Sequence, residues 1–255
     1  MYGIRSSFCA MSLALLTPAM GADAPVYEPA LPVIDVPHLS PTVSAPVIDG
    51  VLEDAAWNSA ATVNSFTFPW WESGRKPHTI AQVTWDDRAL FVAFKSQDRN
   101  VSARQAQRDD PVSRDDCVEV FFAPDSVDVT TYFNFEFNAL GTILDRSPRD
   151  GRSSAWNAAG VEVAITVQGT LNDSTDVDQG WTAEIAIPFS DIAPYAPHLP
   201  PLPGDAWRLN LYRINDQSNR QYSLWSPTLT PKPQFHAPER FGIVRFVPAT
   251  EMTKD

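Results

Sequence analysis

The sequence contains little cysteine, few basic residues and no long hydrophobic run. Only Cys9 and Cys117 occur among 255 residues, so stability must come mainly from burial of a core rather than from disulfides. The 19 Lys and Arg stand against 31 Asp and Glu, which gives a formal net charge of −12. Because phosphate contacts need a basic face, this balance argues against a nucleic-acid partner. No stretch approaches the ~20 consecutive apolar residues of a membrane-spanning helix, so we expect no transmembrane segment.

The first 22 residues are typical of a secretory signal peptide. Arg5 supplies a positive charge, residues 8–16 form a short apolar run, and Ala22 ends a stretch of small residues. We predict cleavage after Ala22 and therefore a secreted or periplasmic protein; the alternative is a buried N-terminal helix. Cys117 would then be the only cysteine of the mature chain. Its place in a strand-like pattern indicates a buried, unreactive thiol.

The remainder of the chain is predicted to form one all-β domain. Residues 23–41 contain five prolines and are predicted to be an extended linker. The domain is expected over 42–248, followed by a polar tail over 249–255. The 23 prolines of the chain disfavour long helices, and one short helix is expected over 53–60. Regularly spaced strands without long helices between them predict a sandwich of two antiparallel sheets.

Alternation of apolar and polar residues locates the strands. In the clearest case Phe133, Phe135 and Phe137 fall on one face, and the polar residues that alternate with them, including Glu136, fall on the other. Residues 141–145 are expected to pair back onto this strand. The predicted strands are 78–85 and 89–94, joined by a turn at 86–88, and 117–122, 131–138, 141–145, 161–167, 181–187, 207–213 and 241–246.

The sequence offers little evidence for catalysis. It contains no Gly-x-Ser-x-Gly motif, phosphate-binding loop or dinucleotide fingerprint. Its four histidines are scattered without the spacing of metal ligands, which argues against a zinc site. Glu119 and Glu136 could face each other on neighbouring strands as the carboxyl pair of a glycosidase. The alternative is that these carboxylates are solvated or serve only as hydrogen-bonding groups.

Aromatic and polar side chains are both plentiful, and this combination suits a neutral polar ligand such as a sugar. Flat rings pack against C–H faces, while carboxylates, amides and guanidinium groups form hydrogen bonds with hydroxyls. Most aromatic residues are expected in the core. Exposure is expected for Trp70 and Trp71, which follow a proline in a loop, and for Phe235 and His236 in a proline-rich segment. The polar candidates are Glu119, Asn134, Glu136, Asn138 and Arg213.

Five motifs, in order and with compatible spacings, resemble the family 9 carbohydrate-binding modules over residues 43–247. Residues 47–57 (VIDGVLEDAAW) resemble the opening of that family, I-D-G-x-x-D/E-x-x-W. Residues 83–92 (VTWDDRALFV) resemble its next hairpin. The later correspondences are residues 115–121 (DDCVEVF), 132–141 (YFNFEFNALG) and, at the C-terminal end, 214–216, 224–226 and 235–242.

The resemblance implies a jelly-roll-like β-sandwich that binds sugars or the ends of plant polysaccharide chains without catalysis of its own. Members of the family clamp a sugar ring between two tryptophans. The first clamp position falls near Ser113, where no ring is present, and the second falls near Phe235. Glu119 matches the ligand-binding glutamate of the family, whereas the arginine position falls near Glu136 and the glutamine position near Arg213. Glycoside hydrolases are the partners that the resemblance implies.

Other interpretations stay open at the level of sequence. Some members of the family hold calcium, which makes Asp49, Glu53 and Asp98 candidate ligands; turn or helix-cap roles are the alternative. Related haem-binding domains use Met and His ligands, but every methionine of this chain lies outside the predicted domain. A structural or interaction module of the cell envelope is also compatible with a β-sandwich, because a fold does not determine a function. Calcium apart, we expect no cofactor.

Overall fold

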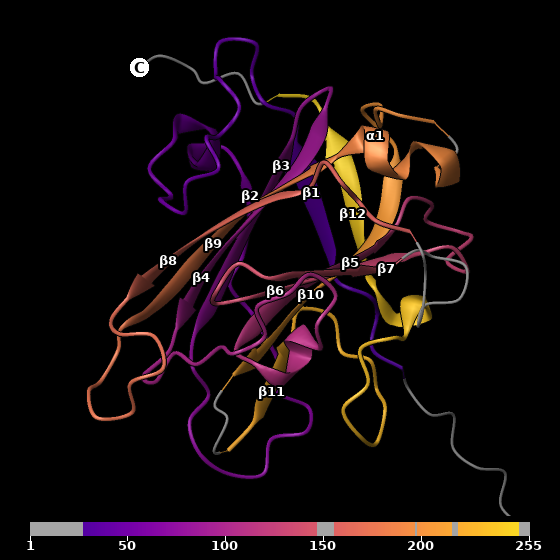
Figure 1. Cartoon of the computed structure of the whole chain (residues 1–255). Helices are drawn as coiled ribbons and strands as arrows, with labels where there is room; N and C mark the ends of the chain where they lie inside the picture. The colour runs from indigo at the N-terminus through magenta and orange to yellow at the C-terminus, as the bar shows by residue number, and fades with distance from the viewer. Residues whose placement is uncertain (1–27, 147–155, 197, 216–218, 250–255) are drawn as a thin grey trace, which may run out of the picture. The chain divides into compact units, whose positions relative to one another are not determined.

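Two β-sheets that share one apolar core make up the fold (Figure 1). The computed structural model describes residues 28–146, 156–196, 198–215 and 219–249. Those from Leu31 onward belong to one unit. The predicted signal peptide over 1–22 lies outside the described residues. In the part of the chain that is described, no helix is long and apolar enough to span a membrane.

The larger sheet has seven strands and carries the candidate site. Its order is β1 (Val33–Pro37), β12 (Gly242–Val247), β10 (Ala206–Asn215), β5 (Cys117–Ala123), β6 (Phe133–Asn138) and β7 (Ile143–Arg146), with β11 (Gln221–Leu224) paired to β10. The pairing of β1 with β12 is parallel, and the other described pairs are antiparallel. The predicted pairing of 141–145 with the preceding strand is confirmed as β7 on β6.

The smaller sheet has five strands, in the order β2 (Ala61–Val63), β3 (Thr79–Trp85), β4 (Ala89–Gln97), β9 (Gly180–Pro188) and β8 (Glu162–Gln168). The predicted hairpin is confirmed as β3 and β4. Its turn is held by Asp86, whose carboxylate accepts hydrogen bonds from the backbone N–H groups of Arg88 and Ala89 at 2.8 and 2.9 Å. The short helices are η1 (Ala55–Asn58), η2 (Val112–Arg114), α1 (Phe189–Ile192), η3 (Ala193–Tyr195) and η4 (Pro238–Arg240).

The core lies between the sheets, where the alternation of the strands predicts it. Phe133, Phe135 and Phe137 all point inward from β6 and are fully buried. Phe122 of β5 stacks on Phe133 and on Trp207 of β10, with ring centroids 5.3 and 5.5 Å apart. These contacts confirm the two-sheet sandwich and the inward face of β6.

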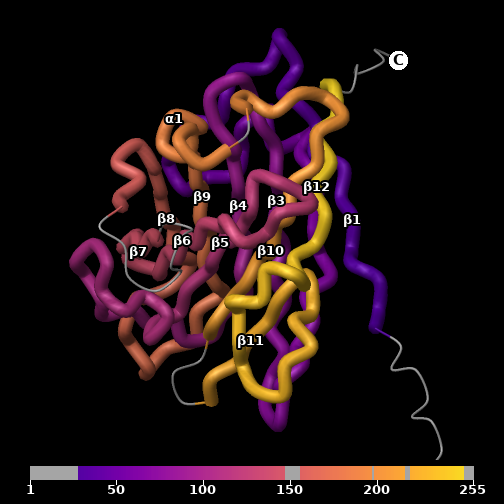
Figure 2. Tube along the Cα trace, turned by 90° about the vertical axis from the view of Figure 1, so that its right-hand side faces the viewer, coloured from indigo at the N-terminus to yellow at the C-terminus, as the bar shows by residue number. Residues whose placement is uncertain are grey.

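A second apolar layer covers the outer face of the larger sheet, and the sequence pattern does not predict it. The chain between β11 and β12 folds back beside β10 and β11, as the yellow tube of Figure 2 shows. It brings Phe235 and Phe241 onto Phe121, Tyr212 and other residues of the outer face. The polar residues that alternate with the core phenylalanines are therefore buried rather than solvated.

Two predictions about elements are corrected, and two strands occur that the sequence pattern does not predict. The linker predicted over 23–41 is wrong for Val33–Pro37, which form β1: Val36 is fully buried, and Asp35 pairs with Arg245 of β12 at 2.6 Å. The prolines of this region flank the strand or end it, so they do not prevent pairing. The helix predicted over 53–60 shortens to the single turn of η1, which packs Trp57 on the outer face of the smaller sheet, beside Phe91 and Ala93. The strands β2 and β11 are too short to show a clear alternation, and neither was predicted.

Cys117 is fully buried and forms no disulfide, as predicted. Burial and the neighbouring Glu119 raise the pKa of its thiol well above the usual value. The reactive thiolate form is therefore disfavoured, which agrees with an unreactive cysteine.

Candidate functional site

Two glutamates face each other on the outer side of the larger sheet. Glu119 of β5 and Glu136 of β6 are direct cross-strand neighbours. Their chain neighbours Val118, Val120 and Phe135 point into the core, so the two carboxyl groups point outward. They are nevertheless only 2% and 7% exposed, because the second apolar layer surrounds them.

The two carboxyl groups line a cavity of about 180 Å³, which we call the Glu119–Phe235 cavity. Strands β5, β6, β10 and β11 form its floor, and the segment after β11 forms its wall. Its lining residues are Ser113, Glu119, Phe121, Glu136, Ile214, Tyr222, Pro233, Gln234, Phe235 and His236.

The aromatic wall of this cavity is held rigidly. Phe235 stacks on Tyr212 with ring centroids 4.2 Å apart and an interplanar angle of 16°. The hydroxyl of Tyr212 also donates to the backbone carbonyl of Phe235 at 2.8 Å. Tyr222 stands edge-on to Phe235 at 6.1 Å. The exposure predicted for Phe235 is therefore wrong: the residue is only 8% exposed, with Tyr212 stacked on one face and the Trp70 ring 6.2 Å away. The ring is fixed before a ligand arrives.

The cavity is lined by a buried acceptor that the protein does not satisfy. Glu136 accepts hydrogen bonds from Asn134 Nδ2 at 3.3 Å and from the backbone N–H of Ser113. Among the described residues, its other oxygen, Oε2, has no hydrogen-bond partner. A buried polar atom without a partner costs about 1–3 kcal/mol, so this oxygen favours a ligand that donates.

Burial favours the protonated form of both carboxyl groups. It raises the pKa of Glu136 from 4.5 to about 7, although the positive charge of Arg146 and two hydrogen bonds oppose the rise. Burial and the charge of Glu136 together raise the pKa of Glu119 well above its usual value. Glu119 therefore holds its proton more tightly than a solvated glutamate does, and a carboxyl pair of which one member is protonated offers both a donor and an acceptor to a ligand.

Arg213 does not belong to this cavity, which corrects the site predicted by the resemblance. Alternation along β10 places Arg213 on the same face as Leu209 and Leu211, toward the core. There its guanidinium group pairs with Asp98 at 2.9 Å and donates to Thr79 Oγ1 at 3.0 Å. The arginine joins the two sheets instead of meeting a ligand beside Glu119.

The other predicted site residues divide between the cavity and its support. Ser113, Glu119, Glu136 and Phe235 meet in the cavity. Asn138 does not line it: its amide donates to Asp115 and to the carbonyl of Gln105, both at 2.8 Å, and its oxygen accepts from two backbone N–H groups of the following turn. Asn138 fixes the loops at the end of β6.

The candidate calcium ligands do not gather at one point. Asp49 lies beside Glu184, which is opposite Ala93 on β4, whereas Asp98 follows the end of that strand. Five residues of extended strand separate these positions by roughly 16 Å. Asp98 is also paired with Arg213. No group of three Asp, Glu, His or Cys side chains that could hold an ion occurs among the described residues, so calcium stays a prediction.

A second hollow adjoins the cavity, and we call it the Trp71 hollow. It measures about 510 Å³ and shares Tyr222 and Pro233 with the Glu119–Phe235 cavity. Trp70 and Trp71 line it, and Trp71 is 42% exposed, as expected for a ring in this loop. Trp70 is anchored by its indole N–H, which donates to the carbonyl of Thr230 at 2.7 Å.

Sequence reasoning missed several lining residues. Phe121 is two positions after Glu119 on the same strand, so alternation alone could have placed it on the same face. Tyr222 lies on the short β11 and gave no comparable signal. Gln234 reaches the cavity only because its segment folds over the sheet.

Comparisons with known proteins agree with this fold. The pattern of the family described as "Carbohydrate-binding family 9" matches residues 50–246. A crystal structure from Bacteroides uniformis, of a protein assigned to carbohydrate binding, is 22% identical, with a TM-score of 0.71 over 85% of this chain and 100% of that chain. No curated protein matches the chain.

Two further similar structures are family 9 carbohydrate-binding modules from Caldicellulosiruptor kristjanssonii. The complex with cellotriose is 16% identical, with a TM-score of 0.57 over 86% of this chain and 95% of that chain. The complex with glucose is 15% identical, with a TM-score of 0.59 over 88% of this chain and 100% of that chain. At such identities the likeness concerns the fold.

Proposed function

Because this chain belongs to Carbohydrate-binding family 9, we propose that it binds a sugar ring in the Glu119–Phe235 cavity and leaves the sugar unchanged. The observation that carries the proposal is a single cavity lined both by a flat ring, Phe235, and by a buried carboxyl group with one unpaired oxygen, Glu136 Oε2. A sugar offers a C–H face to the ring and a hydroxyl to the oxygen. Glu119, whose burial favours the protonated form, can donate to a second hydroxyl.

The size of the cavity favours the end of a chain. At about 180 Å³ it is smaller than the roughly 300–1,000 Å³ of pockets for drug-sized ligands, so it suits one ring. The similar modules of Caldicellulosiruptor kristjanssonii were solved with glucose and with cellotriose. In the present chain a second and third ring would pass Tyr222 and Pro233 and rest against Trp71.

The absence of turnover in this proposal rests on the family and not on the electrostatics of the carboxyl pair. A retaining glycosidase needs one ionised carboxylate as nucleophile beside one protonated acid. With a pKa of about 7, Glu136 is partly ionised at neutral pH, and burial favours the protonated form of Glu119. The match to a carbohydrate-binding family supports binding without turnover.

We further propose that the module works outside the cytoplasm, beside glycoside hydrolases that act on the same polysaccharide. The predicted signal peptide over 1–22 supports the location. A module that binds chain ends raises the local concentration of any enzyme held near it. Amino-terminal sequencing of the exported protein tests the first part, and co-purification with secreted hydrolases tests the second.

Titration calorimetry with glucose, cellobiose and cellotriose tests the proposed binding. We expect saturable binding to the purified protein and a loss of at least about tenfold in affinity for Phe235→Ala, because stacking and apolar contact disappear. Phe68→Ala is the matched control, since Phe68 is half-buried and lines neither cavity. The control should bind as the wild type does.

A second pair of variants tests the role of the carboxyl group in binding, and an incubation with oligosaccharides tests for catalysis. Glu136→Ala should weaken binding, whereas Glu162→Ala, at an exposed position on β8, should not. Incubation of the wild type with the same oligosaccharides should leave them intact. Absence of binding to every member of a broad glycan panel at millimolar concentration, or full affinity in Phe235→Ala, would refute the proposal.

A further inference from the structure

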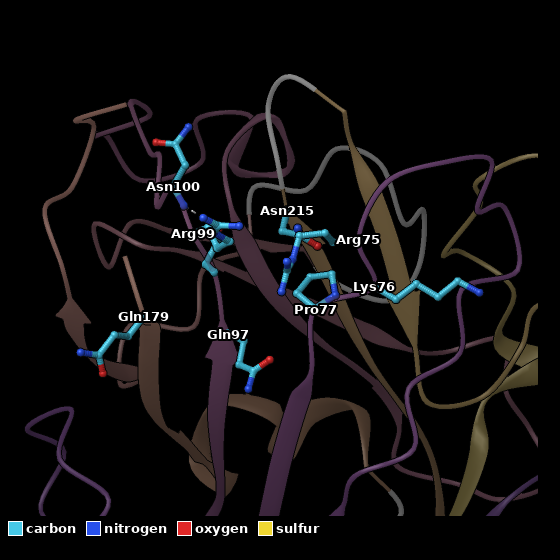
Figure 3. Close-up of a pocket in the computed structure, with 9 residues that line it drawn as sticks. Arg75, Lys76, Pro77, Gln97, Arg99, Asn100, Gln179 and Asn215 are labelled. Atoms are coloured by element: carbon cyan, nitrogen blue, oxygen red, sulfur yellow. Dashed lines mark hydrogen bonds between the residues drawn. The ribbon is translucent and has the colours of Figure 1, made fainter. Parts of the chain in front are cut away.

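A separate polar cleft lies where the ends of β4 and β10 meet the loop before β3. It measures about 410 Å³ and shares no lining residue with the Glu119–Phe235 cavity. Figure 3 shows its side chains, and we call it the Arg75–Arg99 cleft. The lining residues are Arg75, Lys76, Pro77, Gln97, Asp98, Arg99, Asn100, Gln179 and Asn215.

The cleft is positively charged within a chain whose net charge is −12. Arg99 enters it from the end of β4 and Arg75 from the loop before β3, and in Figure 3 their guanidinium groups lie close to the middle of the cleft. Among the described residues, neither guanidinium group has a partner. The carboxylate of Asp98 is already paired with buried Arg213 at 2.9 Å, so it does not compensate them.

Lys76 lines the cleft, but its ammonium group points away from the two arginines. Its side chain extends away from the others in Figure 3, and its Nζ lies 4.4 Å from the centre of the Trp71 ring. This cation–π contact belongs to the Trp71 hollow. The two guanidinium groups therefore supply the available positive charge of the cleft.

An unpaired acceptor at the base of the cleft restricts the ligand further. Asn215 is 4% exposed, and its Oδ1 has no hydrogen-bond partner among the described residues. Because this oxygen can only accept, it requires a ligand that donates. The carboxamides of Gln97, Asn100 and Gln179 along the walls can both donate and accept.

We propose that the Arg75–Arg99 cleft binds a saccharide that carries a carboxylate, such as a uronic acid residue. A guanidinium group pairs with a carboxylate through two parallel N–H donors, and the ring hydroxyls reach the carboxamides and Asn215 Oδ1. A simple inorganic anion would satisfy the arginines but not the buried acceptor. A neutral sugar would leave both arginines unpaired and would meet no aromatic ring among the lining residues.

Calorimetry with trigalacturonate tests this site. We expect binding that weakens with added salt, because the charges are exposed, and the methyl ester of the same trimer should bind at least about tenfold more weakly. The double variant Arg75→Gln/Arg99→Gln should lose at least about tenfold in affinity for the acid. Both arginines are exposed, so the variant should fold normally, as circular dichroism would verify.

Matched variants separate this proposal from the proposed function. Lys95→Gln removes an exposed cation of β4 that does not line the cleft, so it should keep the affinity for trigalacturonate within about twofold. Phe235→Ala should keep it too, whatever its effect on glucose, because the two sites share no lining residue. Equal binding of acid and ester, full affinity in the double variant, or binding of inorganic phosphate as tight as that of trigalacturonate would each overturn the proposal.

Discussion

Replacing Glu136 with glutamine tests the burial of the carboxyl pair through stability. Glu136→Gln keeps the shape of the side chain and removes its ionisable group. In the wild type the folded pKa of Glu136 is about 7 and the ordinary value is 4.5, so the folded state holds this proton more tightly than the unfolded chain does. The resulting stability is fully present below about pH 4.5 and is lost as the pH rises through about 7.

The magnitude follows from the difference between the two pKa values. Each pH unit between them is equivalent to about 1.4 kcal/mol, so the wild type should lose about 3 kcal/mol between pH 4.5 and 8. Glu136→Gln has no ionisable group at this position and therefore does not lose this stability. At pH 8 its free energy of unfolding should exceed that of the wild type by up to that amount. Because Glu119 is coupled to Glu136, part of the change can pass to Glu119, and about 3 kcal/mol is the upper value.

Urea unfolding followed by tryptophan fluorescence at several pH values measures this difference. The variant and the wild type should be closest at low pH and should separate as the pH rises through neutrality. Glu162→Gln, an exposed position on β8, should show no such separation. A difference between Glu136→Gln and the wild type that does not change with pH would refute the burial of an ionisable pair at this position.

Three further predictions concern other parts of the fold. Arg213→Met should destabilise the protein by about 3–5 kcal/mol at neutral pH, because Asp98 stays buried without its partner; a urea midpoint equal to that of the wild type would contradict this ion pair. Val36→Ala should cost about 2 kcal/mol in the same assay, because β1 packs in the core, whereas a linker residue would cost nothing. Trp71→Ala should weaken the binding of cellotriose but not of glucose in calorimetry; equal loss for both sugars would place Trp71 in the first subsite.

The strands and the faces of their side chains could be predicted because both depend on local alternation. The pattern of β6 predicts that Phe133, Phe135 and Phe137 share the core, and the structure has them there. The same pattern along β10 puts Arg213 with Leu209 and Leu211, yet the family resemblance favoured a place beside Glu119. Buried arginines are rare, and the ion pair with Asp98 on the other sheet shows how this one is satisfied in the core.

The short and irregular elements could not be predicted, because their formation depends on partners distant in the sequence. Val33–Pro37 become a strand only because β12 offers a free edge for parallel pairing. The segment that carries Phe235 has no regular pattern, and it is positioned by the stack of Phe235 on Tyr212 and by the Tyr212 hydroxyl.

The fold class and the shared face of Glu119 and Glu136 could be read from the amino-acid sequence, because alternation along strands is a local property, and the family could be read from five motifs in register. The covering of this face, the cavity that Phe235 closes over the two carboxyl groups and the cleft where Arg75 and Arg99 meet are results of tertiary packing. Cavities arise between segments far apart in the chain. The burial that raises the pKa of the glutamates follows from that packing, and no local pattern encodes it.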